Sequence, residues 1–119
     1  MLKSTDGQVY LRRSGPDAAL EVLPRDFSGG YSITSQHEDG IELRLGNVHD
    51  GYMVVGQERR ELPVGSILDP ETGIFYWATS APLLGDYELR FVPDDETAEP
   101  VRVYVKIVPQ QFGVRTARQ

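Results

Sequence analysis

The fold is decided by the stretch LPVGSILDPETGIFYW, residues 62–77, and by GDYELRF, residues 85–91. In the first stretch, the run from Asp69 to Gly73 predicts a tight turn, because Pro70 fixes φ near about −65° and glycine accepts a positive φ. The Asp69 carboxylate can accept hydrogen bonds from the N–H groups of that turn. We therefore expect structural roles for Asp69 and Gly73.

An aromatic strand follows the turn. Ile74, Phe75, Tyr76 and Trp77 are β-branched or aromatic, the side-chain types that suit a half-buried pleated surface. Because side chains alternate along a strand, Phe75 and Trp77 share one face, and Ile74 and Tyr76 share the other. We expect Trp77, the only tryptophan, to be a buried structural anchor rather than a sugar-stacking platform. Tyr76 is then the exposed aromatic and a candidate surface contact.

The second stretch reads as a strand with one face on a core and one in water. Apolar residues alternate with charged ones from Tyr87 onward. Gly85 stands two positions before Tyr87, a spacing that indicates a tyrosine corner, in which the hydroxyl group bonds to nearby backbone and fixes the crossover between sheets. Tyr87 is therefore predicted to be a structural residue.

Together the two stretches resemble the immunoglobulin-like domains, also called cadherin-like, that recur in large bacterial secreted and surface proteins. The shared motifs are Leu-Pro-x-Gly at 62–65, Leu-Asp-x-x-Thr-Gly-x-Phe-x-Trp at 68–77 and Gly-x-Tyr at 85–87. The resemblance covers roughly residues 41–108. It departs at residues 78–82, because family members often carry a proline soon after the tryptophan.

The resemblance implies a β-sandwich used for spacing or adhesion, at the cell surface or outside the cell. Its partners would be neighbouring domains of the same chain, or a protein or glycan. The family has no shared catalytic residues, so the expected module is not an enzyme and has no catalytic, cofactor-binding or metal-binding residue. Residues 1–4 do not open an apolar run of signal-peptide length, so any export signal would lie upstream.

Short alternating segments separated by turns recur along the whole chain. This pattern predicts an all-β protein, an immunoglobulin-like β-sandwich of two antiparallel sheets with about seven to nine strands. We assign residues 1–109 to a single domain and residues 110–119 to a flexible C-terminal tail or linker. The expected strands lie at residues 7–13, 18–23, 31–34, 41–45, 52–55, 74–77, 85–92 and 101–108. Residues 18–23 are also consistent with one helical turn, and a strand is favoured because the neighbouring segments are strands.

Three further expectations concern residues between and on these strands. Glu42 and Arg44 are expected to point into water, opposite the inward side chains of their strand. Residues 47–51 are expected to form a turn. Residues 58–61 are expected to form a solvated charged rim, and the less favoured interpretation is a partner-docking edge that makes Arg59 and Arg60 candidate contact residues.

Composition limits the function classes. The chain has 119 residues and a formal net charge of −6, which argues against binding of nucleic acid or anionic membranes. It contains no cysteine, so it has neither disulfides nor a thiol nucleophile. No segment approaches the ~20 consecutive apolar residues of a membrane helix. The motifs of phosphate-binding loops, zinc proteases and nucleophile-elbow hydrolases are also missing.

Two polar clusters raise the question of a metal. His37 and His49 are expected in turns at opposite ends of a strand ladder, about 20 Å apart, too far for one ion. The acidic loop at residues 94–99 could offer oxygen ligands to calcium, but it lacks the ordered Asp-x-Asp spacing of a calcium loop. A solvated acidic loop is the favoured interpretation, and calcium is the alternative.

Two functions are consistent with these features. The first is a non-catalytic spacer or protein-interaction module of a larger bacterial extracellular protein. The second is a carbohydrate-binding module attached to a secreted enzyme, which requires aromatic side chains aligned on one exposed face. Alternation places Tyr10, Tyr76 and Tyr104 outward, so these are the aromatic residues that the second function would use.

Overall fold

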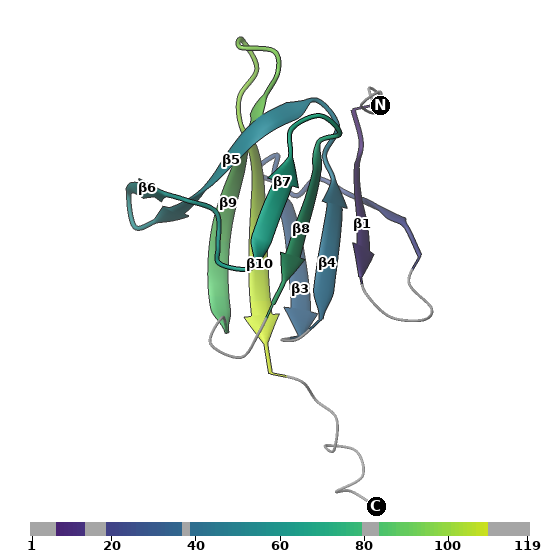
Figure 1. The fold of residues 1–119 in the computed structure, drawn as a ribbon, viewed down its shortest axis with the longest axis vertical. Coiled ribbons are helices and arrows are strands. Elements are labelled where there is room, and N and C mark those ends of the chain that lie inside the picture. Colours follow the sequence, from purple (N-terminus) through teal and green to yellow (C-terminus); the bar gives the residue numbers. More distant parts are fainter. Residues whose placement is uncertain (1–6, 14–18, 37–38, 80–83, 110–119) are drawn as a thin grey trace, which may run out of the picture.

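The computed structural model describes residues 7–13, 19–36, 39–79 and 84–109 (Figure 1). These residues form ten strands and no helix, so the predicted all-β class is confirmed. Residue His37, most of the segment 78–82 and the predicted tail at 110–119 lie outside the described residues. The strands are β1 (Val9–Arg13), β2 (Glu21–Leu23), β3 (Tyr31–Gln36), β4 (Gly40–Arg44), β5 (Val48–Val55), β6 (Glu58–Arg60), β7 (Ser66–Asp69), β8 (Ile74–Ala78), β9 (Gly85–Pro93) and β10 (Val101–Val108).

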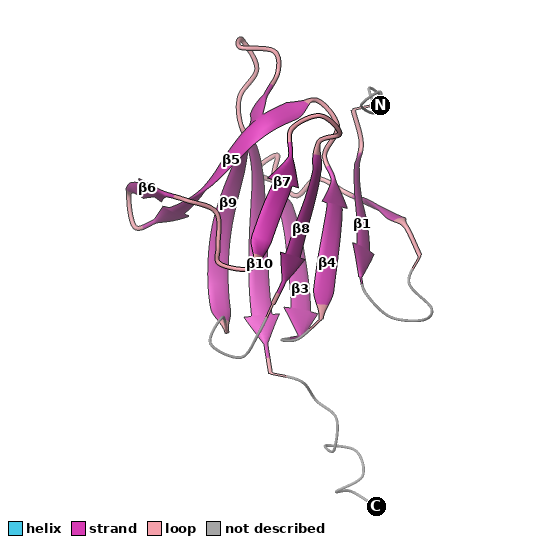
Figure 2. Cartoon of the chain, viewed as in Figure 1, coloured by secondary structure: helices cyan, strands magenta, loops and turns pink. Residues whose placement is uncertain are grey.

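The strands form two sheets that pack on each other as a β-sandwich (Figure 2). We call the sheet with strand order β2-β1-β4-β8-β7 sheet A, and the sheet with order β3-β10-β9-β5-β6 sheet B. The last two predicted strands form, and they pair antiparallel as β9 and β10. One pair departs from the predicted antiparallel pattern, because β3 runs parallel to β10. After β2 the chain crosses from sheet A to sheet B, where β3 forms the edge strand next to β10.

The core lies between the sheets and is joined by two aromatic contacts. Phe75 of β8 meets Phe91 of β9 with ring centroids 5.1 Å apart, and Trp77 meets Tyr87 at 5.0 Å, both edge to face. Such pairs add about 0.5–1.5 kcal/mol to the gain from burial. Trp77 is 1% exposed, and its indole N–H donates to the Val64 carbonyl at 3.2 Å.

The turn between β7 and β8 lies where the sequence predicts it. Gly73 has a φ of 71°, and its N–H donates to the Asp69 carbonyl at 2.8 Å. The Asp69 carboxylate accepts the N–H of Glu71 at 3.0 Å. A Cβ atom at Gly73 would stand 1.9 Å from the Gly46 carbonyl oxygen, so the position excludes any side chain. This turn therefore depends on glycine for both conformation and space.

The turn predicted at residues 47–51 is wrong, because β5 already begins at Val48. The Val48 side chain is 1% exposed and belongs to the core. A register shift between Val48 and Asp50 accommodates the polar residues within the strand. The Gly51 backbone lies close against the Phe91 ring, and a Cβ atom at this position would stand only 2.8 Å from that ring.

Two strands of the structure, β6 and β7, were not predicted, and the strand predicted at residues 18–23 is shorter than expected. The predicted charged rim contains β6, which pairs with β5 across the turn at Gly56, and β7 pairs with β8. In the described part of the segment 18–23, the strand is reduced to Glu21–Leu23. At the end of β5, Val55 is 48% exposed, because the β5–β6 hairpin extends beyond the sandwich (Figure 1).

Candidate interaction surface

Side chains that point away from the core form two outer faces, one on each sheet. On sheet A, the strand register places two rows side by side. One row crosses Val22, Tyr10, Arg44 and Ile74, and the next crosses Arg12, Glu42, Tyr76 and Ile67. We call these eight residues the sheet A face.

Glu42 lies at the centre of the sheet A face and is only 5% exposed, although the sequence predicts it in water. Two arginines cover it. Arg12 Nη2 lies 2.9 Å from Oε1, and Arg44 Nε lies 2.7 Å from Oε2. Tyr76 adds a side-chain hydrogen bond. The alternation was interpreted correctly, but the neighbours on β1 and β8 take the outward carboxylate out of water.

The protonation of Glu42 reflects this cage of donors. Burial favours the neutral acid and raises the pKa. Hydrogen bonds from Arg44, Arg12 and Tyr76 favour the carboxylate and outweigh burial, so the pKa of Glu42 lies below its ordinary value. The carboxylate is therefore ionised at neutral pH. It holds both guanidinium groups in place on the surface.

Exposed apolar side chains lie on either side of this ionic centre, Val22 on β2 and Tyr76 and Ile67 on β8 and β7. Val22 is 50% exposed, Ile67 is 66% exposed and Tyr76 is 51% exposed. Tyr10 and Ile74 are partly buried in the same face. The face therefore combines a shielded carboxylate and its two partly exposed arginines with aliphatic and aromatic groups that remain in water.

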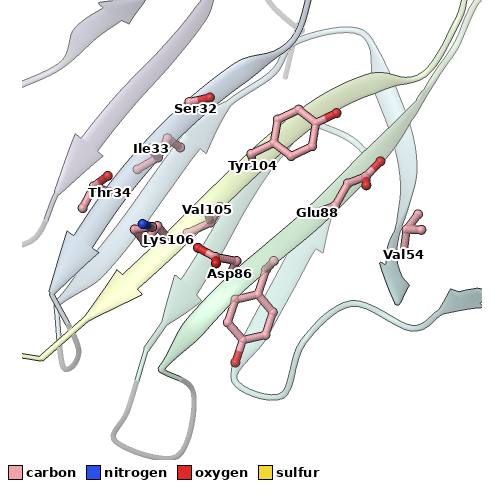
Figure 3. Close-up of a pocket in the computed structure, with 10 residues that line it drawn as sticks. Ser32, Ile33, Thr34, Val54, Asp86, Glu88, Tyr104, Val105 and Lys106 are labelled. Carbon is pink, nitrogen blue, oxygen red and sulfur yellow. The ribbon is translucent and has the colours of Figure 1, made fainter. Parts of the chain in front are cut away.

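The outer face of sheet B has a different character. Figure 3 shows an open hollow along it, lined by side chains of β3, β5, β9 and β10. Lys106 stands opposite Asp86 across the hairpin, and Tyr104 stands opposite Glu88. Arg90 Nη2 binds the Glu88 carboxylate at 2.6 Å. We call this surface the sheet B face. It consists of Ser32, Thr34, Tyr52, Val54, Arg59, Asp86, Glu88, Arg90, Arg102, Tyr104 and Lys106.

The residues predicted as contacts do not form one site. Tyr76 lies on the sheet A face, whereas Arg59 and Arg60 belong to β6 at the edge of sheet B. The Arg59 guanidinium stacks 3.9 Å from the centre of the Tyr52 ring, and Arg60 Nη2 binds Glu58 at 2.7 Å. The arginines are thus engaged locally, and Tyr76 is the predicted contact that lies beside another exposed apolar side chain, Ile67.

The aromatic row required for sugar binding is also divided. Tyr10 and Tyr76 lie on the sheet A face, with β4 between their strands. Tyr104 lies on the sheet B face, as Figure 3 shows. A carbohydrate platform on this fold could use the first two tyrosines together, but not all three.

Two carboxylates of the acidic loop bind groups of the chain itself. Asp94 lies 3.2 Å from Nδ1 of His49, which stands in β5 and not in the predicted turn. Asp95 accepts the Thr97 hydroxyl at 2.7 Å and its N–H at 2.9 Å, and these bonds hold the pKa of Asp95 below its ordinary value. In the described ranges, no three residues of the types His, Cys, Asp and Glu gather in a way that could hold a metal ion.

Sequence reasoning missed the Glu42 cluster because its parts are distant along the chain. Arg12 and Glu42 are 30 positions apart, and only the pairing of β1 with β4 brings them together. The spacing of Glu42 and Arg44, two apart on one strand, was the available signal. This spacing indicates that Glu42 and Arg44 share a face, but it gives no information on the other two partners, Arg12 and Tyr76.

Among the residues that the model describes, no helix has the length and apolar character needed to cross a membrane. Protein-family models, curated proteins and solved structures were compared with the chain, and none of them matches it. Inference about function therefore starts from the residues and their geometry.

Proposed function

We propose that this chain is a non-catalytic immunoglobulin-like module of a larger bacterial extracellular protein, which spaces neighbouring domains and contacts a protein surface through the sheet A face. The observation that carries the proposal is the shielded Glu42 with the exposed Tyr76 and Ile67 next to it in the same row of the sheet A face. The bacterial and extracellular setting rests on the sequence resemblance around residues 62–87.

The strand order supports an immunoglobulin-like module. Strands β1-β4-β8-β7 follow the order A-B-E-D, and β10-β9-β5 follow G-F-C, with β6 in the place of the extra strand C′. Tyr87 stands near the start of β9, the strand equivalent to F, where a tyrosine corner is expected. The tryptophan differs, because Trp77 lies on the strand equivalent to E and not on C.

The composition of the sheet A face supports a protein contact. Aromatic residues and arginine are enriched in protein interfaces, and buried anchors carry most of the binding energy. Arg12 and Arg44 are already fixed by Glu42, so a partner would lose little side-chain entropy when it meets them. The exposed part of Tyr76 beside them is the best anchor candidate.

A single-cysteine labelling experiment tests this contact. The chain has no cysteine, so Tyr76→Cys reports on the sheet A face and Tyr104→Cys is the matched control on the sheet B face. We expect maleimide to label both variants in the isolated chain. In the longer parent protein, we expect slower labelling at position 76 only. Equal labelling at both positions in the parent would contradict the proposal.

A carbohydrate-binding module attached to a secreted enzyme is the second candidate. It is favoured by one observation, the presence of Tyr10 and Tyr76 on one face with the guanidinium donors of Arg12 and Arg44 between them. A glycan array would separate the candidates. Binding that Tyr76→Ala abolishes and Tyr104→Ala preserves would favour sugar binding, whereas silence across the array would reject it.

A further inference from the structure

Four strands lie at sheet edges, and three of them are protected against pairing with another chain. Natural edge strands are kept short or charged, because their unpaired N–H and C=O groups otherwise template a further strand. In sheet A, β2 has three residues and carries Glu21, and β7 has four and ends at Asp69. In sheet B, β6 has three residues, all of them charged.

The remaining edge, β3, lacks these protections. It has six residues, Tyr31–Gln36, and none of them is charged or proline. Its register with β10 runs unbroken over all six positions, so no bulge twists it away. Its other side has no strand partner among the described residues. By the rules that govern natural sheets, this is the edge prepared to accept a strand.

The side chains of β3 are suited to pairing with themselves. Tyr31, Ile33 and Ser35 are buried on the core side, and Ser32, Thr34 and Gln36 are exposed. Figure 3 shows Ser32 and Thr34 on β3, on the outer face of sheet B. In an antiparallel pair of two copies, these short neutral side chains would face each other without like charges, although the whole chain carries −6.

The charges at the two ends of β3 favour an antiparallel arrangement. Near the first end, Arg25 stacks on Tyr31 at 5.7 Å, Arg102 donates to the Ser28 carbonyl and Asp26 binds Ser32, which leaves an excess of one positive charge. At the other end, Lys106 pairs with Thr34 and has Asp86 opposite it, so these two charges balance. The Asp39 N–H donates to the Gln36 carbonyl at 3.1 Å, and this residue adds one negative charge. Antiparallel pairing sets each basic end against an acidic end.

We propose that β3 is a self-association edge, through which two copies of the chain pair antiparallel about a two-fold axis and join their B sheets into one. Both partners then use the same surface, as an isologous interface requires. A single strand pair buries less area than a standard interface, so the dimer is weak and forms at high protein concentration. The edge is separate from the sheet A face and independent of the function proposed above.

Charge reversal on the exposed side of β3 tests the pairing. Sedimentation of the wild-type chain over a range of concentrations should show a monomer–dimer equilibrium. Ser32→Lys/Thr34→Lys and Ser32→Glu/Thr34→Glu should each weaken it by about tenfold or more, because like charges then face each other. An equimolar mixture of the two variants should restore association. Gln57→Lys/Val64→Lys, which adds the same charge at exposed loop positions, should behave as wild type.

Circular dichroism and melting of each variant show that it is folded before association is compared. Both substituted positions are exposed, so native melting is expected. If a double variant does not fold, Thr34→Lys and Thr34→Glu serve in its place. A wild-type chain that stays monomeric at every concentration overturns the proposal. Association that persists in both charged variants, or fails to return in their mixture, overturns it as well.

Discussion

The same tripeptide, Glu-Leu-Arg, occurs once in each sheet, and the two copies have different surroundings. Glu42-Leu43-Arg44 lies on β4 of sheet A, and Glu88-Leu89-Arg90 lies on β9 of sheet B. Both leucines are fully buried, and both glutamates bind the arginine two positions on. Yet the Glu42 side chain is 6% exposed and that of Glu88 is 25% exposed.

Neighbouring strands cause the difference. Glu42 stands between Arg12 and Tyr76, which both reach over it. Glu88 stands between Tyr104 and Val54, and its arginine faces Arg102 and Tyr52. Identical local sequence thus yields a shielded glutamate with two arginine partners on one face and a more exposed glutamate–arginine pair on the other. An outer face is defined by cross-strand partners, which the tripeptide alone does not contain.

The largest expected effect on stability comes from comparing two hairpin turns, β7–β8 in sheet A and β5–β6 in sheet B. Gly73→Ala, at the β7–β8 turn, should lower the free energy of unfolding by at least about 3 kcal/mol, because its Cβ would overlap the Gly46 carbonyl. Gly56→Ala, at the β5–β6 turn, is the control. It also has a positive φ but nothing within 4 Å, so we expect a cost of about 1 kcal/mol. Chemical denaturation measures both, and similar losses would contradict this account.

The second effect tests the tripeptides directly. Glu42→Ala leaves two arginines without their shared carboxylate and should cost about 2 kcal/mol. Glu88→Ala removes a more exposed pair and should cost less than about 1 kcal/mol. Urea unfolding of both variants at low and high salt gives the comparison. Equal costs would mean that the shielding of Glu42 has no energetic consequence.

A smaller effect concerns the interior, which the two sheets share. Tyr87→Phe keeps the ring against Trp77 but removes the hydroxyl group of the predicted tyrosine corner. We expect a loss of about 1 kcal/mol in unfolding free energy, the usual contribution of one hydrogen bond. Thermal melting of the variant provides the measurement. An unchanged melting temperature would mean that the Tyr87 hydroxyl does not make the stabilising hydrogen bond of a tyrosine corner.

The smallest effect is a change in pH dependence. The pKa of Glu42 is lowered in the folded state, so its ionisation stabilises the fold above the ordinary pKa of 4.5, and this contribution is lost as pH falls through the folded value. Asp26 and Asp95 also have lowered pKa values and contribute in the same direction. Glu42→Gln should therefore unfold with a shallower acid dependence below about pH 4.5. An acid profile parallel to wild type would contradict this interpretation.

The interior was largely predictable from sequence because it depends on alternation alone. Alternation along their strands predicts that Phe75, Leu89 and Val103 point inward, and all three are fully buried. The physical reason is that a strand has two faces, so one apolar residue fixes the orientation of its neighbours. Trp77 and Tyr76 follow the same rule, with 1% and 51% exposure.

Features that depend on pairing between distant strands were not predictable. The start of β5 was interpreted as a turn, because His49, Asp50 and Gly51 read as polar turn residues until Phe91 is placed beside Gly51. Glu42 was placed in water for the same reason. The parallel pairing of β3 with β10 and the division of Tyr76 from Arg59 both depend on sheet topology, which no local pattern encodes.

The central claim is that the sheet A face, and not the sheet B face, meets a partner in the parent protein. The most direct test is the ratio of maleimide labelling rates, parent over isolated chain, for cysteine at positions 76 and 104. The claim predicts a ratio well below one at position 76 and near one at position 104. A ratio near one at position 76, or a lower ratio at position 104, would contradict it.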